Sequence, residues 1–378
     1  MMPTQTLVGR DMHKRMREAL RHGQPDRTPI FEYVLLSPIA DQVLGHPYLD
    51  DGSDREAWLA YAREHGWERA VRRHAQDKVT LARLLGHDMI YLRPTLLPRD
   101  VEHSAHPAPV PQREQEPLMN GDPVESILRR NQLGEQGAAT PLDADLFLVY
   151  DFLQEELRRQ GVEACVLAPA YAHGVWTDVA LMQTMLLEPE VAQRHFELAT
   201  GFSLKLIEAY LSHSVELIGV GGDFAGNRLI ISPSAYQQFI VPEVRKLSES
   251  IHRGGGYAVN ASDGNLWPVI DDFLDGCGVD GYLEIDANAG MGLLALKERF
   301  GDRVTFFGNI DCGSLLSFAT PEEIRRVVIQ CLQEGMPSGG HVFCASNAIT
   351  SSVPLENYLA MVNAYREVFG LPAFRLRG

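Results

Sequence analysis

The chain has 378 residues, of which 45% are hydrophobic and 22% charged, a composition typical of a soluble globular protein. Its 34 lysines and arginines against 50 aspartates and glutamates give a formal net charge of -16. A field of that sign repels nucleic-acid phosphates and anionic lipid headgroups, so neither nucleic acid nor a membrane surface is an expected partner.

The cysteines are five in number and show no Cys-x-x-Cys spacing, so they predict neither a disulfide framework nor a zinc knuckle. No apolar leader segment is visible before Arg10 and Lys14, and no apolar run is long enough to cross a bilayer. We therefore expect a protein of the reducing cytoplasm. The sequence leaves the oligomeric state open.

In chain order, the pattern begins with a helix over Met12–His22, part of an N-terminal helical cap of about residues 1–24. Short β-type apolar runs follow, and longer amphipathic segments separate most of them. The predicted strands are Ile30–Tyr33, Asp88–Leu92, Ala164–Leu167, Leu217–Val220, Tyr257–Asn260, Gly281–Glu284, Val304–Gly308 and Val342–Cys344. The clearest predicted helices are Glu188–Ser212, Pro233–Gly254, Leu266–Asp275, Met291–Phe300 and Pro321–Glu334.

Eight strands with interleaved helices favour an α/β fold of the closed (β/α)8 type, a TIM barrel, with the whole chain 1–378 as a single domain. No glycine-rich dinucleotide or P-loop motif is present, which argues against a nucleotide-binding sheet. The stretch Pro94–Pro123 is rich in proline and polar residues and includes His103 and His106. We predict a long loop there, within an insertion or lid over about 94–145.

The residues just past the carboxyl end of each strand surround the active site of such a barrel. Polar and aromatic side chains follow six of the predicted strands at this position: Tyr171, His173 and Trp176; Asp223, Asn227 and Arg228; Asn260, Ser262, Asp263 and Asn265; Glu284 and Asp286; Asn309 and Asp311; Ser346 and Asn347.

Several carboxylates converging on one mouth suit general acid–base catalysis or binding of a hard cation, and like charges held close raise one another's pKa values. Asp263 is the position we favour most, followed by Asp223, which comes after Gly221-Gly222. Asp311 and Asn265 are equally typical of ordinary helix N-caps, and for these two we favour that structural reading.

His173 is the best-placed imidazole, and we assign it a supporting role in proton transfer. Trp176 and Tyr171 form either an aromatic wall for a ligand or simple core packing. Arg228 either binds a substrate carboxylate through two parallel hydrogen bonds or forms a salt bridge with Asp223. The remaining predicted ligand-positioning side chains are Asn260, Glu284, Asn309 and Asn347.

The second half of the chain resembles the uroporphyrinogen decarboxylase superfamily. The agreement runs from about Glu163 to Phe369, and its blocks keep the family's order and spacing. The resemblance implies a (β/α)8 barrel. The blocks are Gly222–Arg228, Ile231–Pro233, Ala261–Asn265, Gly278–Gly281, Ala289–Met291, Leu296–Gly301, Gly308–Asp311 and Pro354–Tyr358, together with Pro25–Pro29 before the first strand.

The sequence departs from both arms of that superfamily. The decarboxylases bind a polycarboxylate tetrapyrrole through an arginine-containing segment after the first strand, whereas Phe31–Pro38 has no arginine and carries Glu32. The corrinoid-linked methyltransferases use a zinc thiolate site, with a His-x-Cys pair and a later Cys. Those positions are Ala261, Asp263 and about Asn347 here, and the nearby Cys344 is a core position.

From the resemblance we favour methyl transfer from a small O- or N-methylated substrate to a corrinoid carried by a partner protein. Asp263 is then the acid–base group or the ligand of a metal such as zinc in an altered site, with Asp223, Asn260 and Asn347 positioning. The alternative is a carboxy-lyase acting on a small aromatic or pyrrolic acid held by Arg228. A third hypothesis is a ligand-binding barrel without catalysis.

Overall fold

The computed structural model describes residues 14–36, 38–105 and 121–376. Seven parallel strands form one curled sheet in the order β1 to β7, each paired with its successor in the chain. Seven of the eight predicted strands are therefore confirmed. The strands are β1 Met89–Tyr91, β2 Cys165–Pro169, β3 Leu217–Gly221, β4 Tyr257–Ala261, β5 Gly281–Leu283, β6 Thr305–Phe307 and β7 His341–Val342.

The predicted strand Ile30–Tyr33 is not a regular strand, which corrects the expectation of eight. Its segment makes only isolated parallel bridges, from Ile30 to Phe343 and from Leu35 to Ile349. On the other flank, the Asp88 amide donates to the Ile30 carbonyl at 2.7 Å. The segment thus contacts both edges of the sheet at single positions, and Pro29 has no amide hydrogen to extend a ladder.

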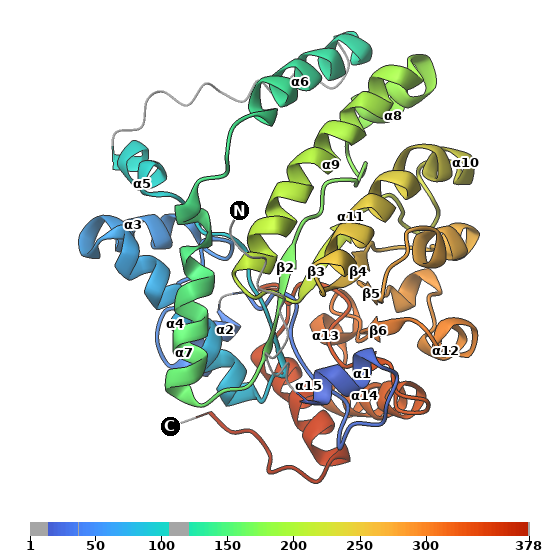
Figure 1. Ribbon diagram of the computed structural model, residues 1–378. Helices are drawn as coiled ribbons and strands as arrows, with labels where there is room; N and C mark the ends of the chain where they lie inside the picture. Colours follow the sequence, from blue (N-terminus) through green and yellow to red (C-terminus); the bar gives the residue numbers. More distant parts are fainter. Residues whose placement is uncertain (1–13, 37, 106–120, 377–378) are drawn as a thin grey trace.

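Helices surround the sheet, as Figure 1 shows. The first group comprises α1 Lys14–Leu20, α2 Ile39–Leu44, α3 Arg55–His65, α4 Trp67–Leu85, α5 Pro98–Ala105, α6 Pro123–Ala138 and α7 Leu148–Gln160. The second comprises α8 Val179–Leu187, α9 Pro189–Ser212, α10 Pro233–Ala235, α11 Val241–Arg253, α12 Leu293–Phe300, α13 Leu315–Phe318, α14 Pro321–Gly335 and α15 Leu355–Val368. No helix of the described segments is long and apolar enough to cross a membrane.

The predicted loop over Pro94–Pro123 is partly helical, since α5 occupies its first part and α6 starts at its last residue. Asp122 accepts a hydrogen bond from the Val124 amide and caps α6, whose first residue is proline. Two of the prolines in this stretch therefore mark the first residues of helices. His106 and the middle of the insertion or lid expected over about 94–145 fall in the stretch 106–120, which lies outside the described residues.

Two apolar layers sandwich the sheet because successive strand residues point to opposite faces. The inner layer contains alternate residues such as Val259 and Ala261 of β4, and α1 contributes Met16 and Leu20 to it. The outer layer packs the helices against the other face. This alternation decides which side chains past each strand face the interior of the curled sheet and which face the helices.

A buried carboxylate fastens the 29–36 segment to the sheet. Asp88 accepts hydrogen bonds from the Ile30 amide at 3.0 Å and from both terminal nitrogens of Arg27, at 3.1 and 3.2 Å. Arg15 of α1 also pairs with Asp88. One nearly buried group therefore connects α1, the 29–36 segment and β1.

Asp88→Ala should lower the free energy of unfolding by about 3–5 kcal/mol, because it removes the buried carboxylate that two partly buried arginines share and leaves the buried Ile30 amide without this acceptor. Denaturant unfolding would measure the change. Asp26→Ala is the matched control, since it removes only the exposed partner of Arg15 and should cost less than about 1 kcal/mol. Equal losses in the two variants would contradict the fastening role.

Candidate active site at the carboxyl ends of the strands

Three carboxyl groups gather where β3, β4 and β5 end. Asp223, Asp263 and Glu284 each offer an oxygen atom, and these atoms lie within 4.8 Å of one another. Each residue follows its strand by one or two positions. Parallel strands bring their carboxyl ends to one edge of the sheet, so residues far apart in the sequence meet here.

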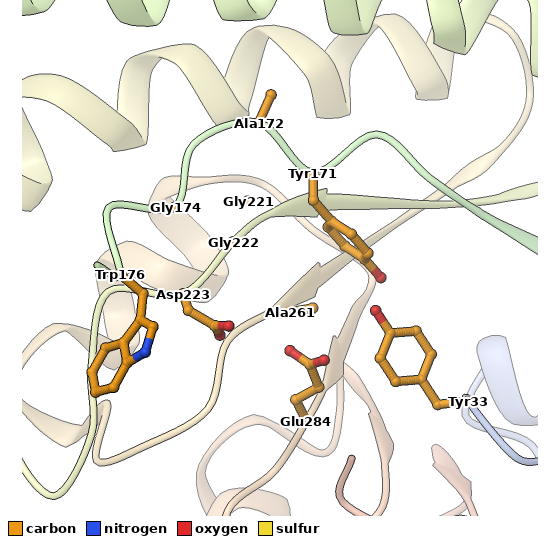
Figure 2. Close-up of a pocket in the computed structure, with 10 residues that line it drawn as sticks. All are labelled: Tyr33, Tyr171, Ala172, Gly174, Trp176, Gly221, Gly222, Asp223, Ala261 and Glu284. Atoms are coloured by element: carbon orange, nitrogen blue, oxygen red, sulfur yellow. The ribbon is translucent and has the colours of Figure 1, made fainter. Parts of the chain in front are cut away.

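Two of the carboxylates, Asp223 and Glu284, line a pocket of about 450 Å³, and Asp263 lies beside them without forming part of its lining. Figure 2 shows Asp223 and Glu284 pointing into the space between Trp176 on one side and the Tyr33–Tyr171 pair on the other. Trp176 is 50% exposed at the mouth, whereas Tyr33 is buried. The lining is Tyr33, Tyr171, Ala172, Gly174, Trp176, Gly221, Gly222, Asp223, Ala261 and Glu284.

Hydrogen bonds fix the two aspartates relative to each other. The Asp263 amide donates to Oδ1 of Asp223 at 3.0 Å. Asn347 donates from Nδ2 to Oδ2 of Asp263 at 2.7 Å, and its own Oδ1 accepts from the Ala348 amide. One oxygen of each aspartate is thus engaged by the protein. The other oxygen of each is the one that can act on a ligand.

The electrostatics of the cluster keep part of it protonated. Burial, followed by repulsion from Asp223 and Asp286, raises the pKa of Asp263 to about 7, against the opposing hydrogen bond from Asn347. Burial, followed by repulsion from Asp223 and Asp263, raises the pKa of Glu284 well above its usual range. Asp263 is therefore suited to hold or release a proton near neutral pH.

Glycines allow the chain segments to approach closely around the cluster. A Cβ at Gly222 would lie 2.7 Å from the Gly174 amide nitrogen, and one at Gly174 would lie 2.8 Å from that of Asp223. Gly264, directly after Asp263, has a φ of +89°, and a Cβ there would lie 2.4 Å from the Gly226 carbonyl oxygen. A side chain at any of these positions would collide with the backbone of a neighbouring segment.

The structure does not bring His173 to the carboxylates. Its ring is fully buried between the sheet and the helices, and Nε2 lies 2.9 Å from Thr200 Oγ1. Thr200 in turn donates to Glu243 at 2.8 Å. Burial lowers the pKa of His173 to about 4. His173 is therefore not placed to transfer a proton to or from the three carboxyl groups.

Three predicted ligand-positioning residues also lie away from the pocket lining. Asn260 has the outward parity of β4 and donates to the Phe273 carbonyl at 3.0 Å. Asn309 donates to the Met291 carbonyl at 3.3 Å. Arg228 is exposed and is not among the lining residues. Of the ligand-positioning set, Tyr171, Trp176 and Glu284 line the pocket, and Asn347 contacts Asp263.

The two expected helix N-caps are not the N-cap residues themselves, since Ser314 precedes α13 and Leu266 precedes the turn at Trp267, but both bond to nearby backbone amides. Asp311 accepts from the amides of Gly313, Ser314 and Leu315. Asn265 accepts from the Trp267 amide at 3.2 Å. Both therefore serve local turns, and the cluster of three carboxyl groups is distinct from them.

Two residues at the carboxyl edge of the sheet are absent from the sequence prediction: Tyr33, which lines the pocket, and Arg93, which lines a separate cavity. The side chains of Tyr33 and Phe31 both lie in the inner apolar layer. The centroid of the Tyr33 ring lies 4.5 Å from that of Tyr91. Arg93 comes two residues after β1 and has the parity of Met89 and Tyr91, both in the inner layer. The alternation of side chains along the strand could have identified Arg93, but this residue directly precedes the stretch that we predicted to be a proline-rich loop.

The donor set decides which metal the site fits. Of the described residues that line the pocket, none is a cysteine, and Cys344 is a buried core residue, as expected. A zinc thiolate centre therefore does not fit these residues. Asp223, Asp263 and Glu284 form an all-oxygen set, which suits a hard divalent cation and lies at the position where the sequence suggested Asp263 as a ligand.

Comparison with known proteins identifies the family. The family model described as Uroporphyrinogen decarboxylase (URO-D) matches residues 169–368, more than half of the chain. The chain belongs to the URO-D family. That stretch holds every residue of the carboxylate cluster.

Similar curated proteins carry the name uroporphyrinogen decarboxylase. One from Coxiella burnetii is 26% identical over 186 residues, 47% of each chain. One from Alkalilimnicola ehrlichii is 25% identical over 297 residues, 75% of this chain and 70% of that protein. The chain thus spans about half the length of the relatives that it matches first. The solved structure of a methyltransferase from Methanosarcina mazei is 18% identical, has a TM-score of 0.65 and covers 95% of this chain and 99% of its own, which shows a shared fold.

Gly264→Ala should destabilise the protein by several kcal/mol more than Gly290→Ala. The two glycines have φ values of +89° and +88°, but a Cβ at Gly290 meets nothing within 4 Å. The shared strain costs about 1–2 kcal/mol in each variant, so the difference measures the close approach at Gly264. Thermal unfolding of both variants tests this, and equal shifts would refute the packing argument.

Asp263→Asn should gain stability relative to the native chain as the pH rises. The carboxyl titrates near 3.8 when unfolded and near 7 when folded, so the folded state holds an extra proton between these values. The native free energy of unfolding therefore falls from about pH 4 to pH 7, by roughly 1.4 kcal/mol for each unit of pKa shift.

Urea unfolding at pH 4 and pH 8 measures this difference. The exposed Asp302→Asn is the control, and we expect it to follow the native curve. A constant gap between Asp263→Asn and the native chain at both pH values would contradict the raised pKa.

Proposed function

We propose that the protein is an enzyme that transfers a methyl group from a small O- or N-methylated substrate to a corrinoid carried by a partner protein. The observation that carries this proposal is the cluster of Asp223, Asp263 and Glu284 against an aromatic-walled pocket. Membership of the URO-D family and the shared fold of the Methanosarcina mazei methyltransferase support it.

The lining chemistry favours methyl transfer over loss of carbon dioxide. None of the described lining residues is a lysine, arginine or histidine. A carboxylate about to leave as carbon dioxide would sit beside three acidic groups without a counter-charge. An ether oxygen or a methylated nitrogen meets no such repulsion, and aromatic faces such as Trp176 attract a methylated ammonium group.

In this proposal Asp263 is the proton donor. The bond between the heteroatom and the methyl carbon breaks, the heteroatom keeps the bonding electrons, and it takes the proton from Asp263. The reduced corrinoid supplies the electron pair that forms the new bond to the methyl group. Asn347 holds Oδ2 of Asp263, so the proton would be donated from Oδ1. Asp223 orients the same residue through its amide.

An oxygen-bound divalent cation offers a second role for the cluster. Asp223, Asp263 and Glu284 would hold it, and it would polarise the heteroatom that loses the methyl group. Metal analysis of the purified protein, with Asp263→Ala beside it, distinguishes the two roles. Stoichiometric metal lost in the variant assigns Asp263 as a ligand, and metal-free active protein assigns it as the proton donor.

Methyl transfer should be lost in Asp263→Ala and should decline as the pH rises through about 7, because the proton donor is then ionised. The assay supplies cob(I)alamin with a panel of methoxybenzoates and methylated amines and follows methylcobalamin formation. We expect a decrease of roughly 100-fold or more in the variant, and native rates in Asp302→Ala. A native rate in Asp263→Ala would overturn the role, and carbon dioxide release without cobalamin would favour the carboxy-lyase alternative.

A further inference from the structure

A second cavity of about 150 Å³ lies at the carboxyl end of β1, on the same edge of the sheet as the carboxylate cluster. It is bounded by α4, by the turn before α3 and by the residues after β1. Unlike the first pocket, it contains basic groups. Its lining is Val34, Asp50, Gly52, His74, Lys78, Tyr91 and Arg93.

Asp50 is fully occupied by protein donors. Its Oδ1 accepts from the Gly52 amide at 2.8 Å, and its Oδ2 accepts from Tyr48 at 2.8 Å and lies 2.7 Å from Lys78 Nζ. Such a carboxylate is a poor metal ligand, although Asp50 and Asp51 lie close to His74. Its function is to hold Lys78 in place and offset the charge of that residue.

The donors that remain belong to His74, Lys78 and Arg93. His74 is 2% exposed, and neither ring nitrogen has a hydrogen-bond partner among the described residues, although Nε2 lies 3.7 Å from Oδ2 of Asp50 and Nδ1 lies 3.8 Å from Oδ1 of Asp51. The Arg93 side chain is 46% exposed and reaches Asp51 only at 3.9 Å. Such a set of partly satisfied, convergent N–H donors suits a carboxylate or another small anion.

Gly52 makes room for this arrangement. A Cβ at Gly52 would lie 1.9 Å from Arg93 Nη2. The absence of a side chain at this position therefore determines where the guanidinium can lie.

The two pockets share a wall. Tyr33 lines the first and Tyr91 lines the second, and their rings are in contact at 4.5 Å. The hydroxyl of Tyr91 lies within the electrostatic influence of both Arg93 and Glu284. A molecule lying across the two tyrosines would thus meet Asp223 and Glu284 at one end, and Arg93 with the Lys78–Asp50 pair at the other.

We propose that the cavity around Arg93, Lys78 and His74 is a carboxylate-binding subsite, and that the substrate is a small acid whose methylated end lies at Asp223, Asp263 and Glu284. This inference rests on the proposed function and adds a substrate class to it. The bridging geometry requires one separation between the methylated end and the acid group.

Calorimetric titration with ω-trimethylammonio carboxylates that have one to five methylenes between nitrogen and carboxylate tests the proposal. We expect one chain length to bind best, and Arg93→Ala to weaken that compound by roughly tenfold or more. The corresponding methyl ester, which lacks the anionic charge, should bind alike to both proteins. Arg253→Ala, which removes an exposed arginine on α11, is the matched control and should keep native affinity.

Gly52→Ala is the second variant, because it displaces the Arg93 side chain without changing the charge and should reproduce part of the loss. Native affinity across the series in Arg93→Ala would overturn the subsite. Tight binding of Zn²⁺ that is lost in His74→Ala would overturn it in favour of a metal site. A length optimum without methyl transfer would leave the subsite standing and refute only the proposed reaction.

Discussion

Three acidic groups held within 4.8 Å of one another repel as soon as they ionise, and the arrangement around them shows how the fold tolerates this. Two of the three, Asp263 and Glu284, respond by keeping their protons to higher pH. The scaffold does the rest, because the strands, the Asp263 amide and the Asn347 side chain fix the groups independently of their charge. Binding of a proton or a cation at this position relieves the repulsion.

The rhythm of apolar runs predicted the sheet well. Seven strands lie where the pattern placed them, since buried parallel strands read as short β-branched and aliphatic segments. The same register located Asp223, Asp263 and Glu284 at one edge, since that edge follows from parallel connection alone. The part that failed, Ile30–Tyr33, depends on pairing to residues about 310 positions away, which local pattern does not encode.

Side-chain direction was harder to predict than position. Asn260 and Asp263 are three residues apart, yet one bonds to the helix layer and the other faces the carboxylate cluster. His173 follows its strand as closely as a catalytic residue would, but Thr200, 27 positions later, binds its ring behind the sheet. Such outcomes are set by helix packing on the outer face. Arg93 shows the reverse case. The alternation of β1 places its side chain on the inner face, but the proline-rich composition of the following residues indicated a loop.

Trp176 gives the site a built-in optical reporter. Its indole is half exposed at the mouth and lies against Gly226, whereas Trp58 is fully buried, and the indole N–H groups of the partly buried Trp67 and Trp267 donate to the Leu96 and Gly290 carbonyls. A ligand that enters would displace water from this ring and change its emission, while the buried indole would respond little. Occupancy of the pocket can therefore be followed by fluorescence before any substrate is known, in the unlabelled protein.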